Sequence, residues 1–302
     1  MVRNLRKAQV TVLLTEKLDS LSQRLFSPSD LTQLFTQLRA DRGLPKSLTA
    51  NQFRDLALEN KVLKEVKLNS TYPLRTIRYH NGHFTAYELA LSLRPRSYLC
   101  HGTAALLHGL TDSHPEYVYV NQEQSAKEQF GSLTQAALNR AFSGRQRQSG
   151  FIVTHDTAKI MLLSGKETSE LAVNESKGPD GELVRLTNLE RTLVDIAVRP
   201  GYAGGTTNVL RCYNQAIQKI SVEDLVEILE ELDYLYPYHQ AIGFLLQRSG
   251  HRPDSLAKLR KHRIKYDFFL AHGMKETRLD PLWRIYYPAD LPDYSETVRV
   301  PP

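Results

Sequence analysis

Residues 49–68 read TANQFRDLALENKVLKEVKL, and this stretch decides the predicted fold of the amino-terminal part of the chain. Thr49 is followed three residues later by Gln52, which is the spacing of a capping box, where each side chain bonds the backbone amide of the other residue. Phe53 and Leu56 then recur at helical spacing together with Ala57. The pattern therefore predicts a short helix that begins after Thr49 and buries one face.

Two more helices are expected before this stretch, and two strands after its helix. Leu and Val recur at helical spacing between residues 5 and 25. In Ser27-Pro28-Ser29-Asp30, a capping hydroxyl, a proline and an acidic residue coincide at one predicted helix start, and that helix should end near Arg42-Gly43. Residues 62–68 and 74–79 favour strands joined by a turn-rich connection. Helices followed by a basic hairpin are the pattern of a winged helix-turn-helix.

Positive charge is concentrated in residues 1–82. This segment holds 14 Lys and Arg against 7 Asp and Glu, a net charge of +7, so the remaining residues sum to −1 (25 basic against 26 acidic) within a total of +6. A cationic patch on one module indicates binding to a phosphate backbone, because each neutralised phosphate releases condensed counterions. A solvated cationic face without a ligand is the alternative interpretation.

Side-chain chemistry assigns expected roles within this module. Amide and guanidinium groups can form paired hydrogen bonds with base edges, so we expect Asn51 and Arg54 to read bases, with Gln52 beside them. Contacts to backbone phosphates are expected from three residues before the helix: Lys46, Ser47 and Thr49. The expected hairpin would add non-specific affinity through five cations: Lys61, Lys64, Lys67, Arg75 and Arg78. A winged helix that binds protein instead of DNA is the alternative.

The chain is long enough for two domains. We expect an α+β protein, with an N-terminal winged helix-turn-helix at residues 1–82 and a mixed α/β C-terminal domain at residues 83–302. Short strands between residues 117 and 186 precede a helical block in that second domain. A basic extension begins at about residue 250, and it is either a second nucleic-acid surface or a cationic helix before a core strand. Its cations are Lys258, Arg260, Lys261, Arg263 and Lys265.

Two blocks of the second domain resemble those of AbiEi-type antitoxins. They read SYLCHGTAALLHGL at residues 97–110 and LTNLERTLVDIAVRP at residues 186–200, and a glycine loop, GYAGG, follows at residues 201–205. The resemblance covers roughly residues 20–235. It implies a transcriptional regulator of a type IV toxin–antitoxin (phage-defence) system. Its first module would bind inverted repeats in double-stranded promoter DNA and repress its own operon, and its second domain would counteract a nucleotidyltransferase toxin without forming a stable complex with it.

Both blocks also have structural explanations. Leu189, Leu193 and Ile196 recur as the buried stripe of an amphipathic helix. Arg191 and Asp195 are four residues apart, which predicts an ordinary exposed ion pair worth about 0.3 kcal/mol. The glycine loop could present free amides to an anion. It lacks the Gly-Lys-Ser/Thr of a nucleotide-binding loop, however.

The sequence does not predict an enzyme. His101 and His108 are seven residues apart, about 10 Å along a helix, which is too far for two ligands of one zinc ion. Cys100 beside His101 lacks a third orienting group. Glu182 lies in the segment most like a metal nuclease, but Val184 stands where a lysine is expected. We expect no catalytic residue, metal or cofactor; a winged-helix regulator with a degenerate or metal-dependent nuclease-like C-terminal domain is the alternative.

Cysteine usage and hydropathy indicate the compartment. Only Cys100 and Cys212 occur, and neither belongs to a C-x-x-C motif, which fits a reducing environment. No apolar run approaches the roughly 20 residues that span a bilayer. A cytoplasmic protein without a membrane partner is therefore expected.

Overall fold

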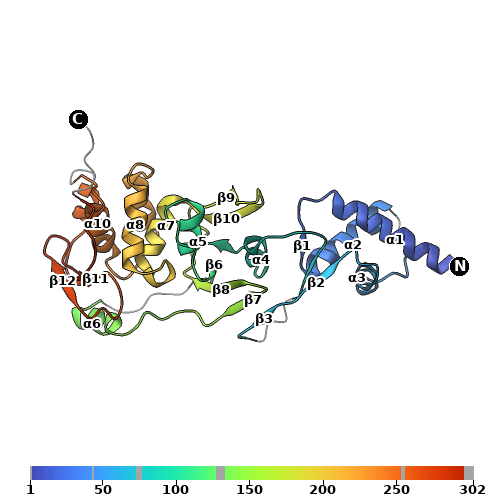
Figure 1. The fold of residues 1–302 in the computed structure, drawn as a ribbon, viewed down its shortest axis with the longest axis horizontal. Helices are drawn as coiled ribbons and strands as arrows, with labels where there is room; N and C mark the ends of the chain where they lie inside the picture. The colour runs from blue at the N-terminus through green and yellow to red at the C-terminus, as the bar shows by residue number, and fades with distance from the viewer. Residues whose placement is uncertain (1, 43, 73–76, 127–132, 253–255, 296–302) are drawn as a thin grey trace.

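The computed structural model describes residues 2–42, 44–72, 77–126, 133–252 and 256–295. Figure 1 shows an elongated molecule, with three helices of the N-terminal part at one end, a large sheet in the middle and the C-terminal helices at the other end. The architecture mixes helices with three sheets, so the expected α+β class is confirmed.

Three helices form a bundle at the N-terminal end: α1 (Val2–Asp19), α2 (Pro28–Arg42) and α3 (Ala50–Glu59). Their common core includes the fully buried Phe53, whose ring lies 5.4 Å from that of Phe35. The predicted start of α3 is confirmed, since Thr49 and Gln52 form the reciprocal capping box. Ser27 and Asp30 cap α2 in the same way, through hydrogen bonds of 2.7 and 3.2 Å.

A three-stranded sheet with the order β1-β4-β2 lies beside this bundle. β1 (Leu25–Phe26) and β2 (Lys64–Val66) both run antiparallel to the middle strand, β4 (Arg78–His80). The two strands predicted after α3 therefore form and pair. β2 is shorter than the sequence pattern indicated, and residues 74–76 of the second predicted strand lie outside the described residues.

Part of the connection between β2 and β4 pairs with the large sheet, which the sequence did not predict. Its residues Asn69–Ser70 form β3, which pairs antiparallel with β7 (Ile152–His155) of the large sheet. The Thr71 hydroxyl also donates to the backbone oxygen of Gly150 at 2.7 Å. The edge strand β7 offers unpaired backbone groups, and β3 satisfies them. The hairpin expected to reach DNA is thus joined to the large sheet of the second domain through β3.

The large sheet has seven strands in the order β3-β7-β8-β6-β5-β10-β9. β6 (Val118–Glu123) runs parallel to β8 (Ala158–Gly165), and β5 (Tyr98–Leu99) runs parallel to β10 (Leu183–Thr187). The other pairings, including that of β9 (Val173–Lys177) with β10, are antiparallel. Side chains alternate between the faces: Ile160 and Leu162 pack with α4 (Ala86–Ser92), whereas Met161 and Leu163 face the other side.

The predicted helical block follows the large sheet. It comprises α7 (Leu189–Val198), the 3-10 turn η1 (Pro200–Tyr202), α8 (Thr206–Ala216), α9 (Val222–Glu231) and α10 (Tyr238–Arg248), and it shares the largest core with α6 (Gln135–Ser143). The shorter α5 (His101–Leu107) and α11 (Ala257–Lys261) pack against α7 and α10, respectively.

A third sheet, with the order β11-β13-β12, completes this end of the molecule and was not predicted. Its strands are β11 (Phe268–Phe269), β12 (Thr277–Asp280) and β13 (Ile285–Pro288). The fully buried Trp283 joins the sheet to α10 by packing on Gly243, where a Cβ atom would lie 2.2 Å from the indole ring. No helix in the described part of the chain is long and apolar enough to cross a membrane.

Candidate functional site

The predicted base-reading residues lie outside the buried face of α3, with Asn51 opposite it and Gln52 and Arg54 on its two flanks. Phe53 faces the core of the bundle, whereas Asn51 and Gln52 are exposed and Arg54 is half-buried. The guanidinium of Arg54 donates to the Asp55 carboxylate at 2.8 and 3.1 Å, and this hydrogen bond raises the pKa of Arg54. The Arg54 Nη1 atom lies 3.5 Å from the Asn51 side-chain oxygen, so the two predicted main readers are neighbours.

The predicted phosphate contacts precede and follow α3. Lys46, Ser47 and Thr49 are exposed in the loop before the helix, and Lys61 and Lys64 are exposed after it. The loop is fixed to α2 because the guanidinium of its Arg39 donates to the backbone oxygen of Leu48. The same guanidinium stacks 4.4 Å from the centre of the Phe35 ring.

Two of the predicted hairpin cations, Arg78 and Lys67, have other positions than expected. Arg78 is buried and donates to the backbone oxygens of Ile77 and Ser92 and to the Ser92 hydroxyl, and burial lowers its pKa. The prediction that Arg78 contacts DNA is therefore wrong, because its guanidinium tethers β4 to the end of α4. Lys67 is exposed, but its backbone oxygen accepts from His155 at 3.0 Å, which places it at the junction with the large sheet. Arg75 lies outside the described residues.

The cations of the basic extension are exposed, but the aromatic residues between and after them are not free to stack on bases. Phe268 is fully buried, and its ring packs 5.0 Å from that of Phe142. A cationic helix followed by a core strand therefore describes this segment better than a stacking surface does. The exposed cations are Lys258, Arg260, Lys261, Arg263 and Lys265.

A cavity of about 700 Å³ opens on the face of the large sheet opposite α4. Tyr98 and Cys100 line it from the first of the two recurring blocks, and Arg191 and Asp195 line it from the second. Tyr202, in the glycine loop, lies beside them. The blocks, far apart in the sequence, thus meet at one site, which we call the central cavity.

The Arg191–Asp195 pair corrects the sequence prediction of an exposed ion pair. Their side chains are only 6% and 7% exposed, and Nε donates to the carboxylate at 2.9 Å. Arg191 also donates to the backbone oxygen of Leu171 at 3.2 Å. Burial disfavours the charged guanidinium, but the charge of Asp195 outweighs it and raises the pKa of Arg191. The pair is buried because α7 is covered by α5 and by the other helices of the helical block.

Cys100 and His101 lie beside this pair and are uncharged at neutral pH. The Cys100 thiol lies 3.0 Å from Nδ1 of His101. Burial raises the pKa of the thiol and lowers that of His101 to about 4. A protonated thiol is a weak nucleophile, so the arrangement does not favour thiolate chemistry. His108 contacts the backbone oxygen of Thr187 at 2.7 Å, as a hydrogen-bonded helix histidine would.

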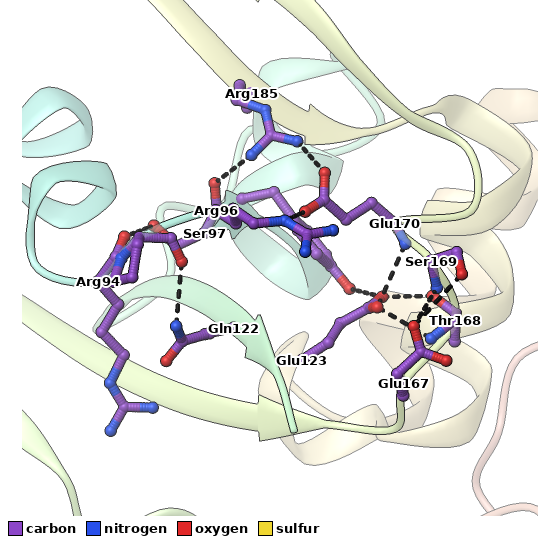
Figure 2. Close-up of polar contacts among 12 residues, drawn as sticks. Arg94, Arg96, Ser97, Gln122, Glu123, Glu167, Thr168, Ser169, Glu170 and Arg185 are labelled. Atoms are coloured by element: carbon purple, nitrogen blue, oxygen red, sulfur yellow. Dashed lines mark hydrogen bonds and ion pairs between the residues drawn. The ribbon is translucent and has the colours of Figure 1, made fainter. Parts of the chain in front are cut away.

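A hydrogen-bonded carboxylate, that of Glu123, lies behind the central cavity and positions the Tyr98 side chain that lines it. Glu123 accepts from the backbone amides of Thr168 and Glu170 at 2.9 and 3.2 Å, as Figure 2 shows, and from the Tyr98 hydroxyl at 2.9 Å. Burial opposes ionisation of Glu123, but these hydrogen bonds and that of the Thr168 hydroxyl lower its pKa overall. Asn121 donates to the Tyr98 oxygen at 2.8 Å and extends the network into the cavity.

Two arginines fix the outer end of this network. Arg96 and Arg185 both pair with the carboxylate of Glu170 (Figure 2). Hydrogen bonds from Arg185 and Arg96 overcome the effect of burial and lower the pKa of Glu170. Glu170 has a positive φ of 57°, a conformation that costs energy in residues other than glycine. The ion pairs therefore hold the loop before β9 in a shape that it would not adopt alone.

Glu182, in the segment most like a metal nuclease, has a structural contact, and so does Glu190 on α7. Glu182 accepts from the backbone amide of Asp180 at 2.9 Å in the turn between β9 and β10. Glu190 accepts from the amide of Ser221 at 3.3 Å, at the start of α9. Among the described residues, no three potential ligands gather as a metal site would require.

Sequence reasoning missed the remaining charged residues of the central cavity. Arg147 and Lys166 come from connecting segments that show no local pattern, whereas Arg199 follows directly after α7 within the second block. A signal for Arg199 was therefore present in the resemblance, but none was present for Arg147 or Lys166.

Comparison with known proteins gives a likeness of fold. No protein-family model matches the chain, and no curated protein matches it either. The structure is similar to the crystal structure of the RV2827C protein from Mycobacterium tuberculosis, with a TM-score of 0.54 and 15% sequence identity over 92% of this chain and 91% of that chain. Fold similarity at this identity does not carry function.

Proposed function

We propose that this protein is a DNA-binding transcriptional autorepressor whose N-terminal part is a winged helix-turn-helix. The element order of helix, strand, helix, helix, strand and strand supports this proposal, as does the sheet order β1-β4-β2 beside the bundle. One observation carries it: Asn51 is exposed opposite the buried face of α3, and Arg54 and Gln52 are accessible on the two flanks of the helix. These side chains could hydrogen-bond base edges in the major groove.

The charges around α3 are suited to the backbone of the same duplex. Lys46 and Lys61 are exposed at the two ends of the helix, and Lys64 is exposed on β2. Lysine acts on phosphate as a point charge and contributes to affinity without reading sequence. Binding should therefore have a sequence-specific part from α3 and a salt-dependent part from these lysines.

We further propose that residues 83–302 counteract a nucleotidyltransferase toxin of a type IV system in the cytoplasm. The support is the resemblance of residues 97–110 and 186–200 to the blocks of AbiEi-type antitoxins. Those blocks line one cavity. The two blocks also pack against each other through α5 and α7, and the cavity adds polar side chains from both blocks that this packing does not require.

Fluorescence anisotropy with the full chain tests the DNA-binding half. The probe is a labelled duplex from upstream of the protein's own gene, with a scrambled duplex for comparison, at about 50 and 200 mM salt. The N51A/R54A double variant should lose about 1–3 kcal/mol per base contact and the preference for the upstream duplex. Arg211→Ala, at an exposed position on α8, is the matched control. Binding that does not weaken with salt, or an equal loss in the control, would contradict the proposal.

Co-expression tests the antitoxin half. The chain should restore growth to cells that express the adjacent open reading frame, if that frame encodes a lethal nucleotidyltransferase. The N51A/R54A variant should still restore growth, because its substitutions lie on α3, remote from the central cavity. Failure of the unchanged chain to rescue growth from a lethal neighbour would refute this half alone.

A further inference from the structure

We infer that the central cavity binds a nucleoside polyphosphate, a ligand that neither the DNA-binding nor the antitoxin proposal includes. Four cationic side chains line the cavity against one carboxylate, that of Asp195, which leaves a formal charge of 4 − 1 = +3. The cations are Arg147, Lys166, Arg191 and Arg199. His101 adds no charge at neutral pH. Such an excess of one sign in a concave site attracts ligands of the opposite charge.

The hydrogen-bond donors of these cations are not all used by contacts with described residues. Arg191 is bonded to Asp195, and the Lys166 ammonium donates to the backbone oxygens of Leu232 and Asp233 at 2.7 and 2.9 Å. Carbonyl oxygens do not cancel the Lys166 charge. Among the described residues, the Arg199 guanidinium donates only to the backbone oxygen of Arg147, at 3.4 Å. The exposed Arg147 guanidinium makes no hydrogen bond or ion pair with any described residue.

Arg147 and Arg199 therefore have donors available for a ligand. Guanidinium groups bind phosphate oxygens in a bidentate manner, and these two enter the cavity from different segments, the loop before β7 and the end of α7. Arg191 and Lys166 add attraction without having to give up their contacts. The arrangement suits a chain of two or three phosphates better than a single phosphate.

The size and walls of the cavity favour an organic group attached to the phosphates. Small-molecule pockets measure about 300–1,000 Å³, and about 700 Å³ is far more than an inorganic phosphate fills. Tyr98, Tyr202 and Tyr234 line the cavity, and the aromatic face of a base can stack on such rings. Asn121 and Gln148 add side-chain amides that can hydrogen-bond a base or sugar.

Titration of the full chain with a fluorescent ATP analogue tests this inference. The double variant R147Q/R199Q should bind at least about tenfold more weakly, a loss of about 1.4 kcal/mol, because it removes two charged contacts to phosphate. Arg211→Gln removes an exposed arginine outside the cavity and should change the affinity less than about twofold. Both variants should keep the melting temperature of the unchanged chain, because neither arginine of the double variant holds the fold together.

Competition identifies the ligand class. Unlabelled ATP should displace the analogue, adenosine should not, and inorganic tripolyphosphate should compete more weakly than ATP. No saturable binding up to about 1 mM, an equal loss in R211Q, or tripolyphosphate competing as well as ATP would overturn the inference. A short single-stranded oligonucleotide that competes much better than ATP would also overturn it and assign the cavity to a nucleic-acid end. DNA binding through α3 should be unchanged in R147Q/R199Q, which separates this test from that of the repressor.

Discussion

Replacing Arg191 by alanine should lower the free energy of unfolding by about 3–5 kcal/mol, the usual cost of removing one partner of a buried ion pair. The substitution leaves the Asp195 carboxylate, whose side chain is only 7% exposed, without its counter-ion. It also removes the donor to the backbone oxygen of Leu171. An exposed pair at the same spacing would cost only about 0.3–0.5 kcal/mol, so the two cases differ about tenfold.

Urea unfolding followed by tryptophan fluorescence provides the assay. Trp283 is the only tryptophan in the sequence, and it is buried against α10 in the core that also contains the apolar face of α7. Its emission therefore reports on the part of the molecule that the substitution perturbs. Arg211→Ala is the control and should stay within about 0.5 kcal/mol of the unchanged chain.

A double variant separates the unpaired charge from other effects. R191M/D195L removes both charges and keeps apolar bulk, so it should cost less than Arg191→Ala alone, because no buried ion is left without a partner. A loss below about 1 kcal/mol in the single variant, or a larger loss in the double variant, would refute the reasoning from burial.

Three further predictions follow from other contacts. Gly243→Ala should destabilise the chain by about 1–3 kcal/mol, because the added Cβ would lie 2.2 Å from the Trp283 ring. An unchanged midpoint of urea unfolding and an unchanged tryptophan emission spectrum would contradict this prediction. Arg78→Ala should cost about 1–3 kcal/mol of stability and leave the salt slope of DNA binding unchanged, because Arg78 is buried. Lys64→Ala, at an exposed position, should reduce that salt slope by about one and leave the midpoint of urea unfolding unchanged. Burial, with a smaller contribution from a neighbouring histidine, lowers the pKa of His239 from 6.5 to about 4. As the pH falls, the unfolded chain therefore protonates His239 before the folded chain does, and stability is lost as the pH falls from about 6.5 to 4. His239→Asn should reduce the fall in the urea unfolding midpoint between pH 7 and 5. An unaltered fall in the midpoint would exclude His239 as its cause.

Local signals predicted the helices of this chain well. The reciprocal caps at Ser27 and Asp30 and at Thr49 and Gln52 place the starts of α2 and α3 at the residues observed. Apolar spacing likewise predicted the order of the helices from α7 to α10. These features depend on residues at most four positions apart, and such interactions are visible in a single sequence.

The strand pairings could not be predicted in the same way. β3 pairs with β7, more than 80 residues away, and nothing in the sequence of Asn69–Ser70 marks that partner. The C-terminal sheet depends on Trp283 meeting Gly243 across 40 residues. The pairing of β3 with the large sheet was not predicted for this reason, because the partner of an edge strand is chosen by packing between distant segments.

The sequence alone determined where charge and helix-forming residues lie: the cationic excess of residues 1–82, the amide and guanidinium side chains after Thr49, and the two blocks of the second domain. Only the tertiary structure decided which charges face water. Arg54 and Arg78 are the same residue type in the same module, yet Arg54 remains accessible and Arg78 bonds the end of α4. Arg191 and Asp195 have the spacing of a surface pair and are buried. The physical reason is that the charge and hydrogen-bonding groups of a side chain are properties of the residue, whereas its burial depends on which distant segments pack over it.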